Sequence, residues 1–247
     1  MTPDRARQAI SLVDLTNLSD DCTVEDVVTL CARARRHGTA AVCVWPDFVA
    51  QSAAALDGTD VAVATVVNFP TGDERPFAVS VLTERSIDDG ADEIDVVLPY
   101  RAFVAGDTAP AADVLGAVRA AAADGVLVKV ILETGELPDL DSVERAASFA
   151  IDHGADFVKT STGKSPVSAT EAAVERMLAA IAHADGTTVG IKPSGGIGTA
   201  DAAEVYLTLA EQAFGADWIS PRTFRFGASS LLGALVAAAG DGDADER

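Results

Sequence analysis

The sequence predicts an α/β protein made of a single (β/α)8 barrel, the TIM-barrel architecture. Short runs of β-branched residues alternate with longer stretches of helical period, and the units recur roughly every 30 residues, as strand–helix units around a parallel sheet do. A length of 247 residues suits eight such units in one domain. No Gly-x-Gly-x-x-Gly motif follows the first strand, which disfavours an open, doubly wound sheet. We therefore expect one barrel over residues 1–239 and a polar tail over 240–247 that frays.

Eight apolar runs have the length and composition of buried parallel strands. Valine and isoleucine are frequent in them, which is typical of strands that are covered on both faces. In chain order the predicted strands cover residues 10–15, 40–45, 61–67, 92–98, 126–132, 156–160, 188–192 and 218–224.

The stretches between these strands have the apolar period of helices. The predicted helices cover residues 24–36, 76–88, 111–123, 140–152, 169–183 and 200–214. A further helix is expected to begin at Pro46, because proline is favoured at the first helical position. All but the 169–183 stretch are followed within two residues by a glycine, which is typical of a helix that ends in a left-handed cap before a short loop.

The charge balance limits the kinds of partner. With 18 basic against 38 acidic residues the formal net charge is −20, so nucleic acid and anionic membranes would be repelled by the surface. A ligand that carries phosphate must then be held by local groups. Abundant acidic residues, scarce lysine and abundant alanine resemble proteins adapted to molar intracellular salt, where such repulsion is screened. An acidic protein without salt adaptation is the alternative.

No membrane-spanning segment is expected. The longest apolar runs, 61–67 and 126–132, are much shorter than the ~20 residues that cross a bilayer, and no positively charged segment leads into an apolar one at the N-terminus. We therefore expect a soluble, cytoplasmic protein. The three cysteines, Cys22, Cys31 and Cys43, lack Cys-x-x-Cys spacing and are expected to be reduced thiols.

The histidines do not indicate a metal site. His37 and His153 each precede a glycine, and His183 lies three residues before Gly186, so all three occupy positions typical of helix ends. Metal-assisted chemistry is therefore not expected.

The chain contains only four lysines, Lys129, Lys159, Lys164 and Lys192, and its other basic residues are arginines. A lysine amine can lose its proton at accessible pH and attack a carbonyl, whereas a guanidinium stays charged. Imine chemistry is therefore the first functional hypothesis.

Five charged residues interrupt strands that should be apolar. They are Asp14, Asp95, Lys129, Lys159 and Lys192. A charge inside a strand that is covered on both faces must either reach solvent at the strand end or point to a polar centre. Because the five come from different strands and carry both signs, we expect them to converge inside the barrel.

Lys159 and Lys192 are the expected reactive pair. They end consecutive predicted strands, where the active sites of barrel enzymes are built. A second cation and partial desolvation both favour the neutral, nucleophilic form of an amine.

Three loops have the composition of a phosphate site. Residues 160–164, 193–197 and 227–230 combine glycines with hydroxyl side chains, and the last two precede helices, whose N-termini bind anions. Ordinary tight turns with a capping serine are the alternative for each loop.

These residues carry a resemblance to a known family. The stretches 156–164 (DFVKTSTGK) and 190–196 (GIKPSGG) resemble the two signature strands of deoxyribose-phosphate aldolases. Further matching stretches lie at 14–16, 41–44, 68–70, 92–97, 129–137 and 224–230. The resemblance covers almost the whole chain in the same order.

The resemblance implies a class I aldolase that reversibly cleaves 2-deoxy-D-ribose 5-phosphate to D-glyceraldehyde 3-phosphate and acetaldehyde without a cofactor. It implies that Lys159 forms the Schiff base, that Lys192 lowers its pKa, and that Asp95 moves protons together with a water. The positions that match supporting, phosphate and sugar contacts are Asp14, Thr16, Lys129, Gly163, Lys164, Gly195, Gly196, Ser229 and Ser230.

Two other functions are compatible with the barrel and its lysines. One is a different Schiff-base sugar-phosphate aldolase, which the paired lysines and the single phosphate site disfavour. The other is a non-catalytic barrel that binds sugar phosphate, in which we would expect Lys159 or Asp95 to be lost. Cys43 matches a cysteine near the family's site, but a small buried strand residue explains it equally well. A homo-oligomer is compatible with the sequence.

Overall fold

Eight parallel strands form the centre of the protein. The computed structural model describes residues 1–122, 125–184 and 188–240. The strands are β1 Val13–Asn17, β2 Ala41–Val44, β3 Ala62–Val67, β4 Glu93–Val97, β5 Leu127–Ile131, β6 Phe157–Lys159, β7 Gly190–Lys192 and β8 Phe226–Ala228. Each pairs with its neighbour in the order β7-β6-β5-β4-β3-β2-β1-β8. The bridges Ile191–Phe224 and Ser194–Gly227 join the two ends of this sheet, so that the strands form a barrel.

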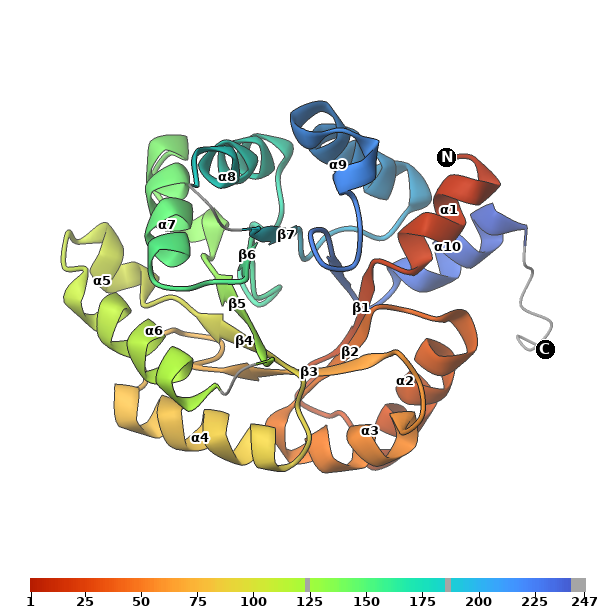
Figure 1. Cartoon of the computed structure of the whole chain (residues 1–247), viewed down its shortest axis with the longest axis horizontal. Helices are drawn as coiled ribbons and strands as arrows, with labels where there is room; N and C mark the ends of the chain where they lie inside the picture. The colour runs from red at the N-terminus through yellow and green to blue at the C-terminus, as the bar shows by residue number, and fades with distance from the viewer. Residues whose placement is uncertain (123–124, 185–187, 241–247) are drawn as a thin grey trace.

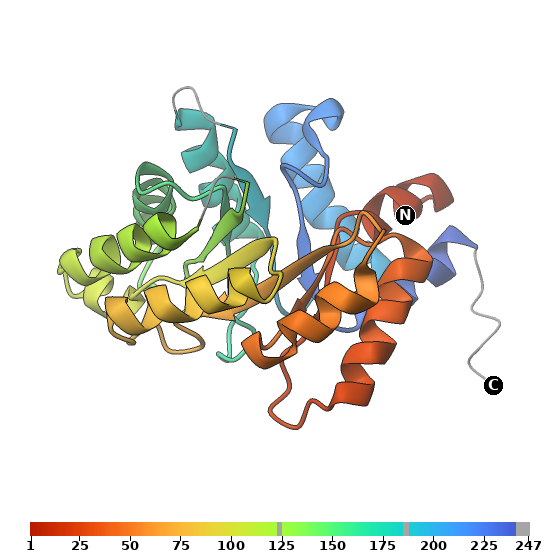
Figure 2. The same cartoon turned by 60° about the horizontal axis from the view of Figure 1, so that its bottom comes forward.

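Helices surround the strands, as the predicted alternation requires (Figures 1 and 2). They are α1 Pro3–Ile10, α2 Val24–His37, α3 Val49–Leu56, α4 Pro76–Asp88, α5 Tyr100–Val104, α6 Ala109–Ala121, α7 Leu140–Asp152, α8 Glu171–His183, α9 Ala200–Phe214 and α10 Leu231–Ala239. Short 3-10 turns lie at Pro46–Phe48, Thr134–Glu136 and Ala216–Trp218. The single (β/α)8 barrel predicted from the sequence is therefore confirmed.

The two ends of the described chain lie together. Helix α1 packs along α10 beside the barrel, so the N-terminal helix covers the last one (Figure 1). The predicted tail lies outside the described residues except for Gly240, which caps α10 in a left-handed conformation with φ of 79°.

Two predicted strands were wrong in their positions. Residues 3–10, which overlap the first predicted strand at Ile10, form α1, because Thr2 caps the helix and Pro3 begins it. The eighth predicted strand, 218–224, contains a turn in which Ser220 and Thr223 bond to each other, and the true strand begins at Phe226. Hydroxyl side chains that bond locally offer the backbone an alternative to the sheet.

The other strands and helices keep their predicted bounds or shift by one or two residues. The predicted helices at 76–88, 140–152 and 200–214 have the bounds expected. The helix predicted over 111–123 runs over Ala109–Ala121, and position 123 lies outside the described residues. The helix predicted from 169 begins at Glu171, where Thr170 provides the cap.

The core has two parts. A large apolar cluster lies between the strands and the helices, and a small one contains Ala41, Cys43, Ala64 and Val66 of β2 and β3. Buried charged residues lie instead on β1, β4, β5, β6 and β7. In the described part of the chain no helix combines the length and the hydropathy needed to cross a membrane.

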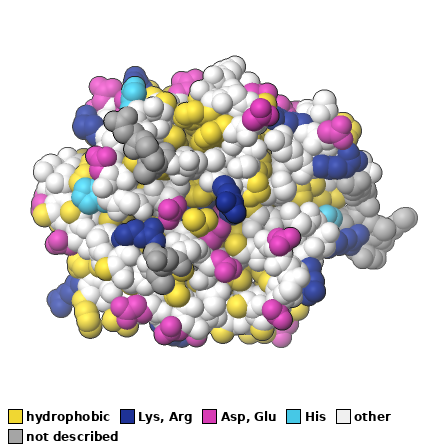
Figure 3. Space-filling view, viewed as in Figure 1, with side chains coloured by type: hydrophobic (Ala, Val, Ile, Leu, Met, Phe, Trp, Pro, Cys, Tyr) yellow, Lys and Arg dark blue, Asp and Glu magenta, His cyan; other side chains and the backbone are white. Residues whose placement is uncertain are grey.

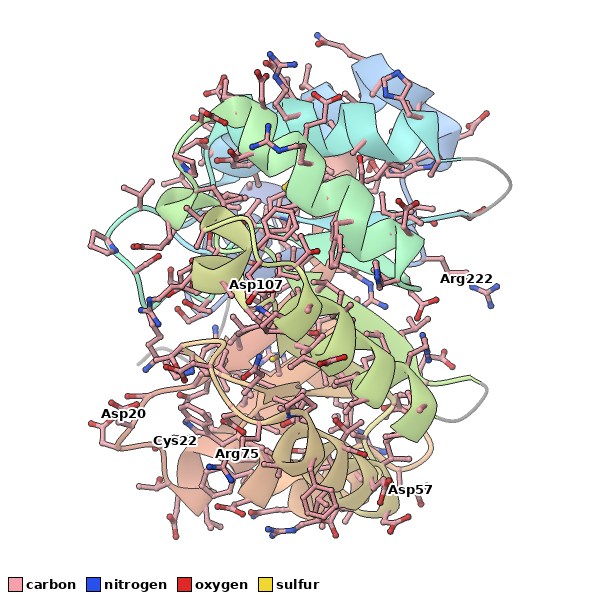
Figure 4. The ribbon with its side chains drawn as sticks, turned by 90° about the vertical axis from the view of Figure 1, so that its left-hand side faces the viewer. Asp20, Cys22, Asp57, Arg75, Asp107 and Arg222 are labelled. Carbon is pink, nitrogen blue, oxygen red and sulfur yellow. The ribbon has the colours of Figure 1, made fainter. Side chains whose placement is uncertain are left out.

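The surface seen in Figure 3 carries acidic side chains scattered among basic ones. Figure 4 shows the two ends of the barrel: Asp20 and Cys22, which follow β1, lie at the opposite end from Arg222, which precedes β8. The loops that follow the carboxyl ends of the strands, where barrel active sites lie, are therefore on the Asp20 side.

Candidate active site

Seven charged side chains are buried together inside the barrel. Each is at most 5% exposed, and they come from β1, β4, β5, β6, β7 and the residue just before β8. The members of this charge cluster are Asp14, Glu93, Asp95, Lys129, Lys159, Lys192 and Arg225.

Asp95 is the centre of the charge cluster, because it contacts all three lysines. Its Oδ1 lies 2.8 Å from Nζ of Lys129, and its Oδ2 lies 2.8 Å from Nζ of Lys159 and 2.7 Å from Nζ of Lys192. Burial alone would raise the pKa of Asp95, but the three ammonium groups outweigh it and hold that pKa well below its usual range. Asp95 therefore stays ionised and fixes the three amines around one point.

Two more carboxylates complete the cluster beneath Asp95. Asp14 contacts Nζ of Lys192 at 2.5 Å and Nη1 of Arg225 at 2.6 Å. Glu93 contacts Nζ of Lys129 at 2.6 Å and Nη2 of Arg225 at 2.8 Å. Arg225 thus bridges two carboxylates with its planar fork, a geometry that lysine does not provide.

The cluster holds four cationic side chains but only three carboxylates. One cation is in excess, and in a buried site the amine with the fewest carboxylate partners loses its proton most readily. That amine belongs to Lys159, which contacts Asp95 alone, whereas Lys192 contacts two carboxylates and Lys129 three. The arrangement therefore favours a neutral Lys159.

The pKa shifts agree with this count of charges. Burial lowers the pKa of Lys159; Asp95 raises it, but burial and the ammonium of Lys192 together leave it below its usual value. Burial would lower the pKa of Lys192 too, but Asp14 and Asp95 raise it overall. The same competition raises the pKa of Lys129. Two of the three lysines thus remain charged beside one amine that can be neutral.

A pocket of about 510 Å³ opens above the cluster at the carboxyl ends of the strands. Lys159 is the one member of the cluster that lines it; Asp95 and Lys192 lie beneath it. The side chain of Lys159 is 4% exposed, whereas that of Lys192 is fully buried. An electrophile in the pocket can therefore reach Nζ of Lys159.

The other end of the pocket is suited to an anion. Gly195 and Gly196 adopt φ values of 83° and 77°, and this conformation turns a loop sharply just before α9. Ser230 precedes α10, and its side chain does not cap that helix, so its hydroxyl is free to bind a ligand at the helix N-terminus. Lys164, whose Nζ lies 3.1 Å from Asp20, adds the one lysine charge that is outside the cluster.

The structure brings together all the residues proposed from the sequence, in two groups. Asp14, Asp95, Lys129, Lys159 and Lys192 form the buried cluster. Among the residues proposed from the sequence, those that line the pocket are Thr16, Lys159, Gly163, Lys164, Gly195, Gly196, Ser229 and Ser230. Only Lys159 belongs to both groups.

Two members of the cluster, Glu93 and Arg225, were missed by the sequence reasoning. Glu93 lies two residues before Asp95 on β4, and this spacing could have revealed it, since alternate residues of a strand share a face. Arg225 was placed just past the end of a mispredicted strand. Cys43 is buried in the small apolar cluster and is not among the residues that line the pocket, and burial raises the pKa of its thiol.

Fold and pocket together define a (β/α)8 barrel with a buried lysine amine that faces a pocket at the carboxyl ends of the strands. The chain belongs to the DeoC/LacD family of aldolases, whose family model matches residues 8–236. It is 53% identical to the deoxyribose-phosphate aldolase of Agrobacterium fabrum (strain C58 / ATCC 33970) over 233 residues, which cover 93% of this chain and 89% of the relative.

Solved structures show the same likeness. The apo form of a Toxoplasma gondii ME49 protein assigned to the deoxyribose-phosphate aldolases superposes with a TM-score of 0.88 at 28% identity, over 98% of each chain. A Coccidioides immitis protein with the same assignment superposes with a TM-score of 0.84 at 29% identity, over 94% of this chain and 86% of that one.

Proposed function

We propose that the protein reversibly cleaves 2-deoxy-D-ribose 5-phosphate to D-glyceraldehyde 3-phosphate and acetaldehyde through an imine on Lys159. One observation carries this proposal: Lys159 is the single amine of the charge cluster that faces the pocket, and its pKa is lowered. The family and the aldolase of Agrobacterium fabrum support the choice of substrate.

The first step in this proposal is attack by the neutral amine of Lys159 on the C1 aldehyde of the open-chain sugar. The resulting carbinolamine takes up a proton on its hydroxyl group, loses water and becomes a protonated imine. Lys192 and Lys129 remain ammonium groups throughout, because their carboxylate partners raise their pKa values. They keep the nucleophile neutral without competing for the aldehyde.

In the second step, removal of the proton from the C3 hydroxyl lets the C2–C3 bonding electrons move into the imine. C3 leaves as the aldehyde of D-glyceraldehyde 3-phosphate, and C2 remains as part of an enamine on Lys159. Protonation of C2 and hydrolysis of the imine release acetaldehyde and regenerate the amine.

Asp95 is the proposed proton carrier, acting with a water molecule. The lysines around it hold its pKa low, and Lys129 and Lys192 stay charged throughout, so Asp95 keeps a proton only briefly. We infer that Asp95 orients the water and Lys159 and passes protons between them, instead of storing one.

Turnover and imine trapping test this function directly. Incubation with 2-deoxy-D-ribose 5-phosphate should release acetaldehyde and D-glyceraldehyde 3-phosphate, and borohydride reduction in the presence of acetaldehyde should add an ethyl group to the peptide that contains Lys159. Absence of both products, or labelling at Lys192 alone, would overturn the proposal.

Ser230→Ala should weaken binding of the phosphorylated substrate. Loss of a hydrogen bond to a charged group at the start of α10 should raise KM for 2-deoxy-D-ribose 5-phosphate by roughly tenfold. KM for unphosphorylated 2-deoxyribose should stay unchanged, and so should both values in Ser80→Ala, which removes an exposed hydroxyl from α4. Equal losses for both sugars would show that the phosphate does not bind at Ser230.

We further infer that the protein is a cytoplasmic enzyme adapted to molar salt, because its formal charge of −20 is offset by few basic residues. At low ionic strength the Debye length reaches about 30 Å, and in molar salt it falls to about 3 Å, so self-repulsion should be relieved as KCl is added. Tm and activity are therefore expected to rise with KCl. A Tm that is flat or falls between about 0.1 M and about 2 M KCl would reject the adaptation and leave the aldolase function untouched.

A further inference from the structure

Glu133 is a buried carboxylate that takes no part in the charge cluster. It follows β5 and is 2% exposed, and among the described residues it forms no ion pair. A buried carboxylate needs hydrogen-bond donors in place of water. The partners of Glu133 therefore indicate its purpose.

All the donors that Glu133 receives come from the loop between β6 and α8. Its Oε2 accepts a hydrogen bond from the hydroxyl of Thr162 at 2.5 Å, and its Oε1 accepts one from the hydroxyl of Ser165 at 2.9 Å. The backbone N–H of Thr162 donates more weakly, at 3.3 Å to Oε2 and 3.4 Å to Oε1. One carboxylate thus holds both ends of the segment that contains Gly163 and Lys164.

A further hydrogen bond connects Thr162, and through it Glu133, to Lys164. The hydroxyl of Thr162 accepts a hydrogen bond from the backbone N–H of Lys164 at 3.0 Å. One residue past Glu133, the N–H of Thr134 donates to the carbonyl of Thr160 at 2.9 Å. The start of the loop, next to Lys159, and its far end, at Lys164, are therefore both fixed against residues 133 and 134.

The backbone around Glu133 is shaped for this contact. Glu133 adopts φ 52° and ψ 58°, a left-handed conformation that a non-glycine residue adopts only at a free-energy cost. Two residues on, Gly135 lies so close to the loop that an added Cβ would be 2.2 Å from the carbonyl oxygen of Val167. The strained backbone at Glu133 and the close contact between Gly135 and Val167 occur at the same junction. Together they indicate that the position of the loop between β6 and α8 is fixed by the residues that follow β5.

The loop positions a further polar group in the pocket. Ser161, between Thr160 and Thr162, lines the pocket, and its hydroxyl is fully buried without a hydrogen-bond partner among the described residues. An unpaired buried hydroxyl is costly unless a ligand satisfies it. The segment fixed by Glu133 therefore carries two polar side chains that line the pocket, Ser161 and Lys164.

We propose that Glu133 is a positioning residue for phosphorylated substrate: its carboxylate clamps the 161–165 segment so that Lys164 and Gly163 meet the phosphate at a fixed distance from Lys159. This inference rests on the proposed function. Glu133 does not touch substrate, because it is absent from the residues that line the pocket. It acts through Thr162 and Ser165.

Three variants of the full-length protein test the clamp. Glu133→Ala removes every acceptor and should raise KM for 2-deoxy-D-ribose 5-phosphate at least tenfold, with KM for unphosphorylated 2-deoxyribose unchanged. Glu133→Gln should restore KM to within a few-fold of wild type, because its amide oxygen can still accept from Thr162 and its amide nitrogen can donate to Ser165. Ser165→Ala, which lies outside the pocket lining, should give a smaller rise in the same KM.

The possible outcomes distinguish a failure of the proposed role of Glu133 from a failure of the proposed function and from a loss of folding. A wild-type protein that does not cleave the sugar phosphate would reject the proposed function. If wild type cleaves it while Glu133→Ala and Ser165→Ala keep the wild-type KM for both sugars, the clamp is wrong. A fall in kcat for both sugars at unchanged KM would show a merely structural role and would also overturn it. If Glu133→Ala does not fold, Ser165→Ala still decides, since it is expected to raise the KM for the phosphorylated sugar alone.

Discussion

Lys159→Ala is expected to abolish imine trapping and to lower turnover of 2-deoxy-D-ribose 5-phosphate by at least about 10⁴-fold, since the covalent electron sink is lost. The other two lysines of the cluster cannot replace it. Both have raised pKa values and neither lines the pocket. The measurement is turnover together with mass spectrometry of the borohydride-reduced protein.

Lys159→Met is the control that separates loss of the amine from loss of folding. It fills more of the space than alanine, and it leaves three cations facing three carboxylates in the cluster. We expect its Tm to be close to that of wild type while its activity is lost. Trapping of acetaldehyde at Lys192 in either variant would reverse the assignment of the nucleophile.

Lys192→Met is expected to raise the pKa of Lys159 and to move the pH profile of imine trapping to higher pH. Without Lys192, three cations face three carboxylates, and Oδ2 of Asp95 is left with Lys159 as its one lysine partner, so Lys159 stays protonated. Only the neutral amine attacks, so the rate rises as pH increases through the pKa of Lys159. With that pKa raised, trapping near neutral pH should fall about tenfold or more and recover in part at alkaline pH.

Two further variants serve as controls for Lys192→Met. Lys164→Met removes a pocket lysine that contacts no carboxylate of the cluster, so its trapping profile with acetaldehyde should match wild type. Lys192→Arg keeps the number of charges, so the profile should also stay in place, although the rate should fall because a planar guanidinium replaces a compact ammonium. A Lys192→Met profile that coincides with wild type would mean that Lys192 does not tune the nucleophile.

The barrel could be predicted from the sequence because its strands and helices depend on local patterns of residue type. The middle six strands and the long helices were found because β-branched runs and helical periods are properties of neighbouring residues. The eighth strand was misplaced because residues 218–224 contain a turn in which Ser220 and Thr223 bond to each other, so the strand begins only at Phe226.

The charged residues of the site could also be found from the sequence, for a physical reason. A charge such as that of Asp95 or Lys192 within an apolar strand must find a partner, and the parallel strands of one barrel supply only a shared centre. Arg225 escaped this reasoning because it lies just outside a strand. Glu133 escaped it because its partners lie 29 and 32 residues further along the chain, in a loop with no periodic pattern.

By itself the sequence determined the architecture, five of the six charged residues that the strands contribute to the cluster, and the loops that surround the pocket, because each depends on residue type and spacing. The tertiary structure decided which lysine amine is suited to act as the nucleophile. That choice depends on how many carboxylates from distant strands lie within ion-pair distance of each amine and on which amine faces the pocket. Coulomb energy and desolvation vary with distances between groups far apart in the chain, and only folding sets those distances.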